Sequence, residues 1–185
     1  LFGNCYSILE TDSINLSGLS LTSSVSDDLG LLVNLKYIDL SNNYISGDIP
    51  NTIDQLIHLE YLNFSTNNLI GELPSELGSL SNLKTLILSN NQLTGLIPSN
   101  LTDLESLEYL DLSKNEFYGQ IPSQIGVLDE LVLLGLYEND LDGIIPESIT
   151  DVLNLQYLLL HNNSLVGSIP NELGNLSQMR ILSLW

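Results

Sequence analysis

The chain has 185 residues, of which 43% are hydrophobic, and a formal net charge of −19 from four Lys and Arg against 23 Asp and Glu. This charge argues against nucleic acid or an anionic lipid surface as a partner, because such partners are bound by basic residues that displace counterions. No apolar run approaches the about 18 residues of a membrane-spanning helix, so we expect no direct membrane contact by this segment.

Asparagine, glycine and proline recur with a period of 24 residues, which indicates a repeat architecture. All six prolines, from Pro50 to Pro170, keep this register, and a glycine lies three residues before each of them. The asparagines of the same period are Asn43, Asn67, Asn91, Asn115, Asn139 and Asn163.

The period divides the chain into segments. Residues 1–11 precede the repeats, and residues 12–34 form a degenerate first repeat with Leu19 at the position of Asn and Ser26 at that of Pro. Residues 35–178 form six repeats of 24 residues, and residues 179–185 begin a further repeat. We therefore expect a single repeat domain over residues 1–185.

Each repeat combines two hydrophobic patterns. Ile38-x-Leu40 alternates with the two-residue period of a strand, whereas Ile53-x-x-Leu56 has the spacing of a 3₁₀ or helical turn. A single repeat cannot enclose its own leucines, so neighbouring repeats must stack and share one interior. The sequence predicts an α/β solenoid with one parallel sheet, its strands about 4.8 Å apart, on the inner face and the return segments on the outer face.

The recurring asparagines are interpreted as structural residues. A buried amide offers two donors and one acceptor, which suits backbone groups left free where each strand turns. A catalytic or ligand-binding column is the alternative interpretation.

The repeats resemble the plant-type leucine-rich repeat, whose signature LxxLxLxxNxLxGxIP is matched by LSNNYISGDIP, LSNNQLTGLIP and LHNNSLVGSIP. That family includes ectodomains of receptor-like kinases and receptor-like proteins, and polygalacturonase-inhibiting proteins. The resemblance implies a right-handed superhelix with a parallel sheet on its concave face and 3₁₀ or irregular turns on its convex face. It also implies a secreted or cell-surface location and recognition of peptides, small hormones, glycans or proteins by the concave face.

The N-terminus departs from the family pattern. Family members usually begin with a cap that contains paired cysteines and a Trp, whereas this chain has only Cys5 and its one Trp is Trp185. We therefore expect residues 1–11 to be a remnant of such a cap. A lone Cys5 cannot form an internal disulfide, so cysteine usage does not reveal the redox compartment.

Five Asn-x-Ser/Thr sequons favour a secretory route and an extracellular or cell-surface location. These possible N-glycosylation sites are Asn15, Asn63, Asn100, Asn162 and Asn175.

Side chains between the strand leucines are expected to face solvent in three columns. The third column is serine in five consecutive strands and then changes to Tyr137, His161 and Trp185, while Leu133 and Leu159 replace polar residues in the other columns. Exposed apolar and aromatic residues often mark contact sites, although these could instead cover one another or pack against further repeats. The candidate partner-binding cluster is Tyr109, Leu133, Tyr137, Tyr157, Leu159, His161 and Trp185.

No catalytic, cofactor or metal site is predicted. The glycines are explained by the repeat, and neither His58 nor His161 recurs with a Ser or Cys partner. The chain lacks the Cys and His ligands of a zinc site, and the stretch from Glu138 to Gly143 lacks the spaced acids of a calcium loop.

The leading functional hypothesis is a non-catalytic recognition module, the ectodomain of a cell-surface receptor-like protein that binds a protein or peptide ligand on its concave face. A secreted inhibitor of a wall-degrading enzyme would use the same face. A scaffold or assembly subunit would dock through its acidic surface. The uncovered leucines of the last repeat predict that further repeats or a partner cover the C-terminal end.

Overall fold

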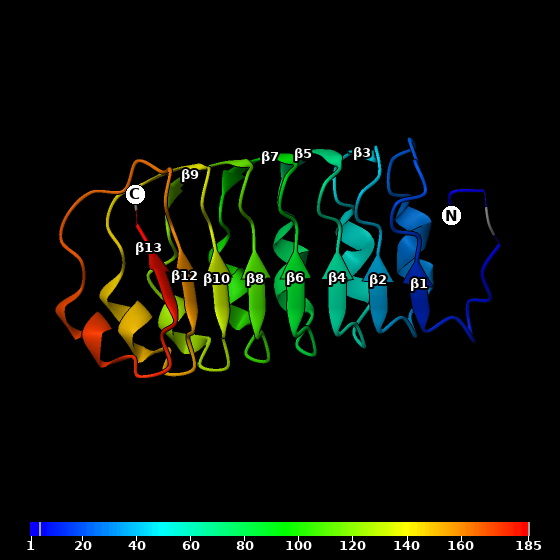
Figure 1. The fold of residues 1–185 in the computed structure, drawn as a ribbon. Coiled ribbons are helices and arrows are strands. Elements are labelled where there is room, and N and C mark those ends of the chain that lie inside the picture. Colours follow the sequence, from blue (N-terminus) through cyan, green and yellow to red (C-terminus); the bar gives the residue numbers. More distant parts are fainter. Residues whose placement is uncertain (4, 185) are drawn as a thin grey trace.

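Each turn of the chain contributes one short strand to a parallel sheet of eight, whose spatial order follows the chain (Figure 1). The computed structural model describes residues 1–3 and 5–184. Paired residues in neighbouring strands are 24 positions apart, as in Tyr37 and Tyr61, so the sequence period sets the register. The strands are β1 (Ser13–Asn15), β2 (Tyr37–Asp39), β4 (Tyr61–Asn63), β6 (Thr85–Ile87), β8 (Tyr109–Asp111), β10 (Leu133–Gly135), β12 (Tyr157–Leu159) and β13 (Ile181–Ser183).

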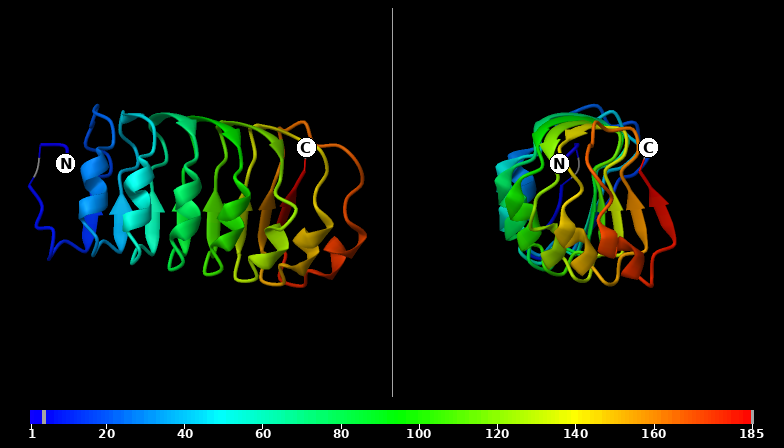
Figure 2. Two further views of the ribbon diagram at one scale, coloured as in Figure 1. Left: turned by 180° about the vertical axis from the view of Figure 1, so that it is seen from behind. Right: turned by 90° about the vertical axis from the view of Figure 1, so that its left-hand side faces the viewer.

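Short 3₁₀ helices return the chain behind this sheet (Figure 2). Most begin directly after the recurring proline, whose fixed φ and missing N–H suit the first turn of a helix. The expected solenoid of parallel strands and 3₁₀ return segments is confirmed. The helices are η1 (Asp27–Leu31), η2 (Asn51–Gln55), η3 (Ser75–Ser79), η4 (Ser99–Asp103), η5 (Ile125–Val127), η6 (Glu147–Asp151) and η7 (Asn171–Asn175).

In the middle repeats, the segments that connect the strands of the first sheet to the 3₁₀ helices form a second parallel sheet, at the top of the coils in Figure 1. The single-sheet expectation was therefore incomplete. The strands β5 (Asn68–Glu72) and β7 (Gln92–Leu96) contain a Leu-x-Gly stretch, and Gly95 in β7 has a φ of 87° that other residues rarely adopt. That glycine interrupts the alternation by which a strand is recognised in sequence. The strands, in spatial order, are β11 (Asp140–Asp142), β9 (Glu116–Gln120), β7 (Gln92–Leu96), β5 (Asn68–Glu72) and β3 (Ser46–Gly47).

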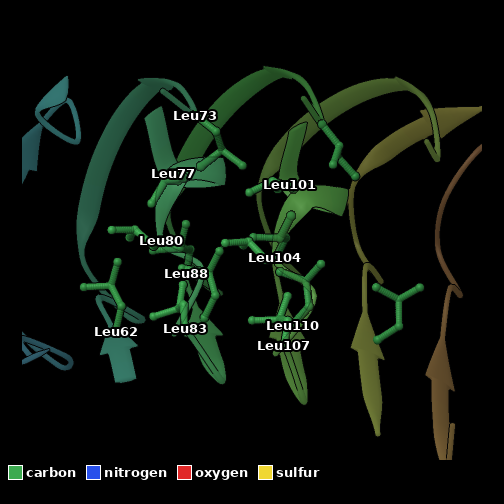
Figure 3. Packing of buried hydrophobic residues seen from close by; sticks show 14 of the residues in the cluster. Leu62, Leu73, Leu77, Leu80, Leu83, Leu88, Leu101, Leu104, Leu107 and Leu110 are labelled. Carbon is green, nitrogen blue, oxygen red and sulfur yellow. The ribbon is translucent and has the colours of Figure 1, made fainter. Parts of the chain in front are cut away.

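Leucines from successive coils fill the space between the sheets and the helices (Figure 3). Leu83 and Leu107 hold equivalent places in adjacent coils, and both are fully buried. The strand leucine of a coil is fully buried where the coil has a neighbouring coil on each side. Leu158 in β12 is 0% exposed, whereas the equivalent Leu182 in the last described coil is 43% exposed. The interior is therefore shared between nearest neighbours.

The recurring asparagines connect adjacent coils by hydrogen bonds. Asn67 donates from Nδ2 to the carbonyls of Leu40 (2.9 Å) and Phe64 (3.1 Å), one in the preceding coil and one in its own. Its Oδ1 accepts from the backbone N–H of Ile45 at 2.9 Å. The hydrogen bond from Nδ2 to a carbonyl of the preceding coil recurs at the other asparagines of the ladder: Asn43, Asn91, Asn115, Asn139 and Asn163.

The residue before each of these asparagines has a left-handed backbone, which the sequence analysis did not anticipate. Asn42, Asn90 and Asn162 occupy this position with φ near +57°, and Asn tolerates it better than other non-glycine residues. Thr66 has the same conformation with φ +55°, although its β-branched side chain disfavours it.

The first eleven residues contain no regular strand or helix among those described. Leu1, Phe2 and Tyr6 nevertheless pack against the first coil of the core. In the described part of the chain, no helix is long and apolar enough to cross a membrane.

Replacing Asn91 by Leu should lower the free energy of unfolding by about 1–3 kcal/mol, because the backbone N–H of Leu69 loses its acceptor and the carbonyls of Phe64 and Leu88 each lose one of two amide donors. Chemical denaturation measures the change. Gln92→Leu, at the exposed neighbouring position, is the control and should change stability by less than about 0.5 kcal/mol. Equal losses in both variants would contradict a structural role for the ladder.

Replacing Thr66 by Asn should raise the free energy of unfolding by about 0.5–1 kcal/mol, because Asn adopts the left-handed conformation at lower cost. The reverse change Asn90→Thr in the next repeat should lower it by a similar amount. Thermal and chemical unfolding of both variants check the sign. A loss of stability in Thr66→Asn would show that the backbone conformation is not the controlling term.

Candidate ligand-binding surface

All four basic residues of the chain lie on or beside the eight-stranded sheet. Lys36 and Lys84 directly precede β2 and β6. Acids hold the same position before neighbouring strands, so the charge alternates along this edge from Asp12 to Glu108. The backbone of each residue is hydrogen-bonded to the next, as in the bond from the N–H of Glu60 to the carbonyl of Lys36. This edge is therefore close to neutral.

The remaining surfaces carry most of the acids and no Lys or Arg. Asp54, Glu76 and Asp103 in the 3₁₀ helices are examples. A like-charged surface of this kind repels acidic molecules and keeps the chain soluble. The eight-stranded sheet is the surface where a ligand meets groups of both signs.

The candidate cluster occupies the C-terminal half of that sheet. Tyr109 on β8 is 40% exposed, whereas Leu133 on β10, and Tyr157 and Leu159 on β12, are half-buried. Their side chains line one face of three adjacent strands, with Leu133 paired to both Tyr109 and Tyr157. The predicted member Trp185 lies outside the described residues.

Two members of the cluster cover one another. The rings of Tyr137 and His161 stack with centroids 4.6 Å apart and planes 8° apart. Lys114 Nζ lies 5.8 Å from the Tyr137 ring centroid and 3.7 Å from a carboxylate oxygen of Glu138. His161 Nδ1 is 3.0 Å from Ser183 Oγ. Mutual covering thus describes these two rings, which are half-buried, as Leu133, Tyr157 and Leu159 are. Tyr109, Leu133, Tyr157 and Leu159 are here called the apolar patch.

The serine column is less exposed than expected. Ser41 is 4% and Ser113 0% exposed, so the expectation that this column faces solvent is wrong for both. Ser113 Oγ donates to Asp111 Oδ1 at 2.6 Å, and the backbone N–H of Ser113 donates to the same oxygen at 3.1 Å. The Ser113 hydroxyl therefore folds back onto its own strand.

The sequence analysis missed a second aromatic feature at the other end of the sheet. Tyr37 and Tyr61, paired on β2 and β4, stack with centroids 4.4 Å apart and planes 6° apart. The Tyr37 hydroxyl donates to Asp39 Oδ2 at 3.5 Å, and Asn63 Nδ2 donates to the Tyr61 hydroxyl at 3.3 Å. Burial, and then the neighbouring Tyr61 and Asp39, raise the pKa of Tyr37, so its phenol stays neutral at physiological pH. The signal was available, since both tyrosines hold the same place in the period.

The five sequons differ in how accessible their amides are. Asn63 is half-buried and uses both side-chain atoms, while Asn100 donates to the carbonyl of Ser75. Exposed Asn15 only accepts, from the N–H of Ser17. Of the five sequon asparagines, Asn162 and Asn175 are exposed and form no side-chain hydrogen bond with any described residue.

Within residues 1–3 and 5–184, no group of three or more His, Cys, Asp or Glu side chains is arranged to bind a metal ion. Cys5 is exposed and unpaired by any disulfide within the described chain.

Comparisons with known proteins agree with this geometry. The family described as Leucine-rich repeat region matches residues 13–116, and Leucine Rich Repeat matches residues 106–128 and 154–176. The LRR receptor-like serine/threonine-protein kinase GSO2 of Arabidopsis thaliana is 51% identical over 43 residues, which are 23% of this chain and 3% of that protein.

Two solved structures are similar over most of the chain. One is the LRR ectodomain of the plant membrane receptor kinase GASSHO1/SCHENGEN3 from Arabidopsis thaliana in complex with CASPARIAN STRIP INTEGRITY FACTOR 2, with a TM-score of 0.90, 38% identity, and coverage of 91% of this chain and 20% of that one. The other is the plant peptide hormone receptor RGFR1 in complex with RGF2, with a TM-score of 0.87, 36% identity, and coverage of 89% and 26%.

This chain spans about a quarter or less of the length of these relatives. The repeats, the parallel sheet with its 3₁₀ return segments and the family match nevertheless agree over most of its residues. The chain belongs to the leucine-rich repeat family, in its plant-type form.

Proposed function

We propose that the chain is a ligand-binding part of the ectodomain of a cell-surface receptor-like protein, and that it binds a peptide or protein segment across the eight-stranded sheet. The observation that carries the proposal is the apolar patch. Leu133, Tyr157 and Leu159 lie on adjacent strands of a sheet whose corresponding N-terminal positions are mostly polar. Two relatives of the same fold are described as complexes with a partner, which supports this assignment.

The patch has the chemistry of a binding hot spot. Tyr supplies a large apolar surface with a polar end and few rotatable bonds, and such residues often dominate binding energy. Burying the exposed part of one Tyr or Leu side chain contributes about 1–2 kcal/mol. Several such side chains on neighbouring strands suit an extended segment that crosses the sheet.

The inhibitor and scaffold hypotheses place different demands on the molecule. An inhibitor of a secreted enzyme would use the same patch, and no described feature favours an enzyme over a peptide as its partner. A scaffold would use the acidic outer surface, where the patch has no role. The receptor assignment accounts for the patch and agrees with the described relatives.

Replacing Tyr157 and Leu159 by Ser should weaken the binding of peptides selected from a random display library by at least about tenfold, because both contacts are lost. Isothermal titration measures the affinity. The matched control replaces Tyr118 and Leu96 by Ser, an exposed Tyr and Leu pair in register on β9 and β7 of the other sheet.

The control should leave affinity unchanged, and both double variants should keep the cooperative melting of the parent. Peptides whose affinity falls only in the control would move the binding surface to the five-stranded sheet and overturn the proposal.

A secretory route predicts which sequons carry glycans. Asn162 and Asn175 should be occupied after expression in a secretory host, because both amides are exposed and free of side-chain hydrogen bonds within the described residues. Asn63 should stay largely unmodified, since its Nδ2 donates to Tyr61 and its side chain is half-buried. Glycopeptide mass spectrometry measures occupancy, and full occupancy of Asn63 with bare Asn162 would contradict this ranking.

A further inference from the structure

The stacked tyrosines end abruptly on the N-terminal side. The ring of Tyr37 is covered by Tyr61 on one face. On the other side its partner in β1 is Ser13, an exposed residue with a small side chain. The separation of the two stacked centroids, 4.4 Å, is close to the strand spacing of about 4.8 Å. A further planar group over β1 would therefore continue the stack at its natural spacing.

A carboxylate with free capacity lies beside the hydroxyl end of the Tyr37 ring. Asp39 Oδ1 accepts from the backbone N–H of Ser41 at 2.9 Å, while Oδ2 has only the long 3.5 Å contact with the Tyr37 hydroxyl. No Lys or Arg of the described chain forms an ion pair with Asp39. Lys36, which directly precedes β2, lies between the acids Asp12 and Glu60 of the neighbouring coils.

The opposite end of the stack lacks such a charge. Beyond Tyr61, the next strand carries Thr85 at the paired position. The residues of β4 and β6 that correspond to Asp39 are the neutral Asn63 and Ile87. The Asp39 carboxylate therefore makes the Tyr37 end of the stack different from the Tyr61 end.

We propose that the open face of Tyr37 and the carboxylate of Asp39 form a subsite for an arginine side chain of the peptide ligand. A guanidinium is planar, stacks on aromatic rings and donates two parallel hydrogen bonds to a carboxylate. The net charge of −19 attracts a cationic segment toward the chain. A sugar ring also stacks on tyrosine and its hydroxyls can donate to a carboxylate, but a sugar is uncharged and forms no ion pair with Asp39.

The position of the subsite constrains the ligand. From β1 to β10 the sheet has five strand spacings, which is about 24 Å. An extended peptide covers that distance in about seven residues. This inference rests on the proposed function and adds to it: the ligand carries an arginine about seven residues from the apolar side chains that contact Leu133 and its neighbours.

The test uses small blocked amino acids as probes, so it does not depend on the apolar patch. N-acetyl-arginine amide, its neutral isostere N-acetyl-citrulline amide and N-acetyl-lysine amide are titrated into the chain at millimolar concentrations. The aromatic proton and carbon signals of the tyrosines are followed by NMR. The protein is made without N-glycans, because Asn15 lies on the same strand as Ser13.

The arginine probe should shift the Tyr37 and Tyr61 signals together, with an affinity at least about fivefold above that of citrulline. Lysine should bind more weakly than arginine, because it cannot stack as a plane. Asp39→Asn should reduce the arginine affinity by about fivefold or more. Asp111→Asn on β8 is the matched control and should leave these shifts unchanged, since Asp111 has the same column position and adjoins an unstacked Tyr109.

Equal affinities for arginine and citrulline, or an Asp39→Asn variant that binds arginine as the parent does, would overturn the subsite. Shifts produced by methyl α-glucoside and not by arginine would identify a sugar platform and would also overturn it. If selected peptides bind through Tyr157 and Leu159 but arginine produces no shift, the subsite alone fails. If arginine shifts the Tyr37 and Tyr61 signals but the Tyr157 and Leu159 double variant binds selected peptides as the parent does, the subsite stands and the apolar patch is not the peptide-binding surface.

Discussion

No coil of this protein can bury its own leucines, and the rest of the structure follows from that constraint. A coil of 24 residues has too little thickness to surround Leu158, which is fully buried only because coils lie on both sides of it. Stacking leaves backbone groups to be satisfied where the strands turn, and the asparagine ladder does this with bonds to two coils at once. The period, the sheet register and the core are three consequences of one packing requirement.

The same constraint decides where the chain can vary. Leucine, asparagine, glycine and proline positions are committed to the coil, whereas the side chains between the strand leucines are free to differ from repeat to repeat. They vary along the sheet: two stacked tyrosines lie near one end, Thr85, Ile87 and Ser89 in the middle, and the apolar patch near the other end. The bases share this face, whereas acids dominate the other surfaces.

The 24-residue period made most of the fold predictable, because it recurs often enough to fix strand, turn and return segment without reference to any one residue. The second sheet was missed because Gly95 and its equivalents break the alternation of a strand. The covered serines and the ring stack of Tyr137 and His161 were missed for a different reason. Column position tells which way a residue points, but exposure depends on contacts with neighbours, and these emerge only in three dimensions.

The central claim is that the eight-stranded sheet, held in shape by a core shared between coils, is the surface that binds the ligand. A crystal structure of the chain with a peptide selected for affinity tests it most directly. The account predicts an extended peptide that crosses β8, β10 and β12 and covers Tyr157 and Leu159. A peptide seated on the five-stranded sheet or on the 3₁₀ helices, with the eight-stranded sheet left open to solvent, would contradict it.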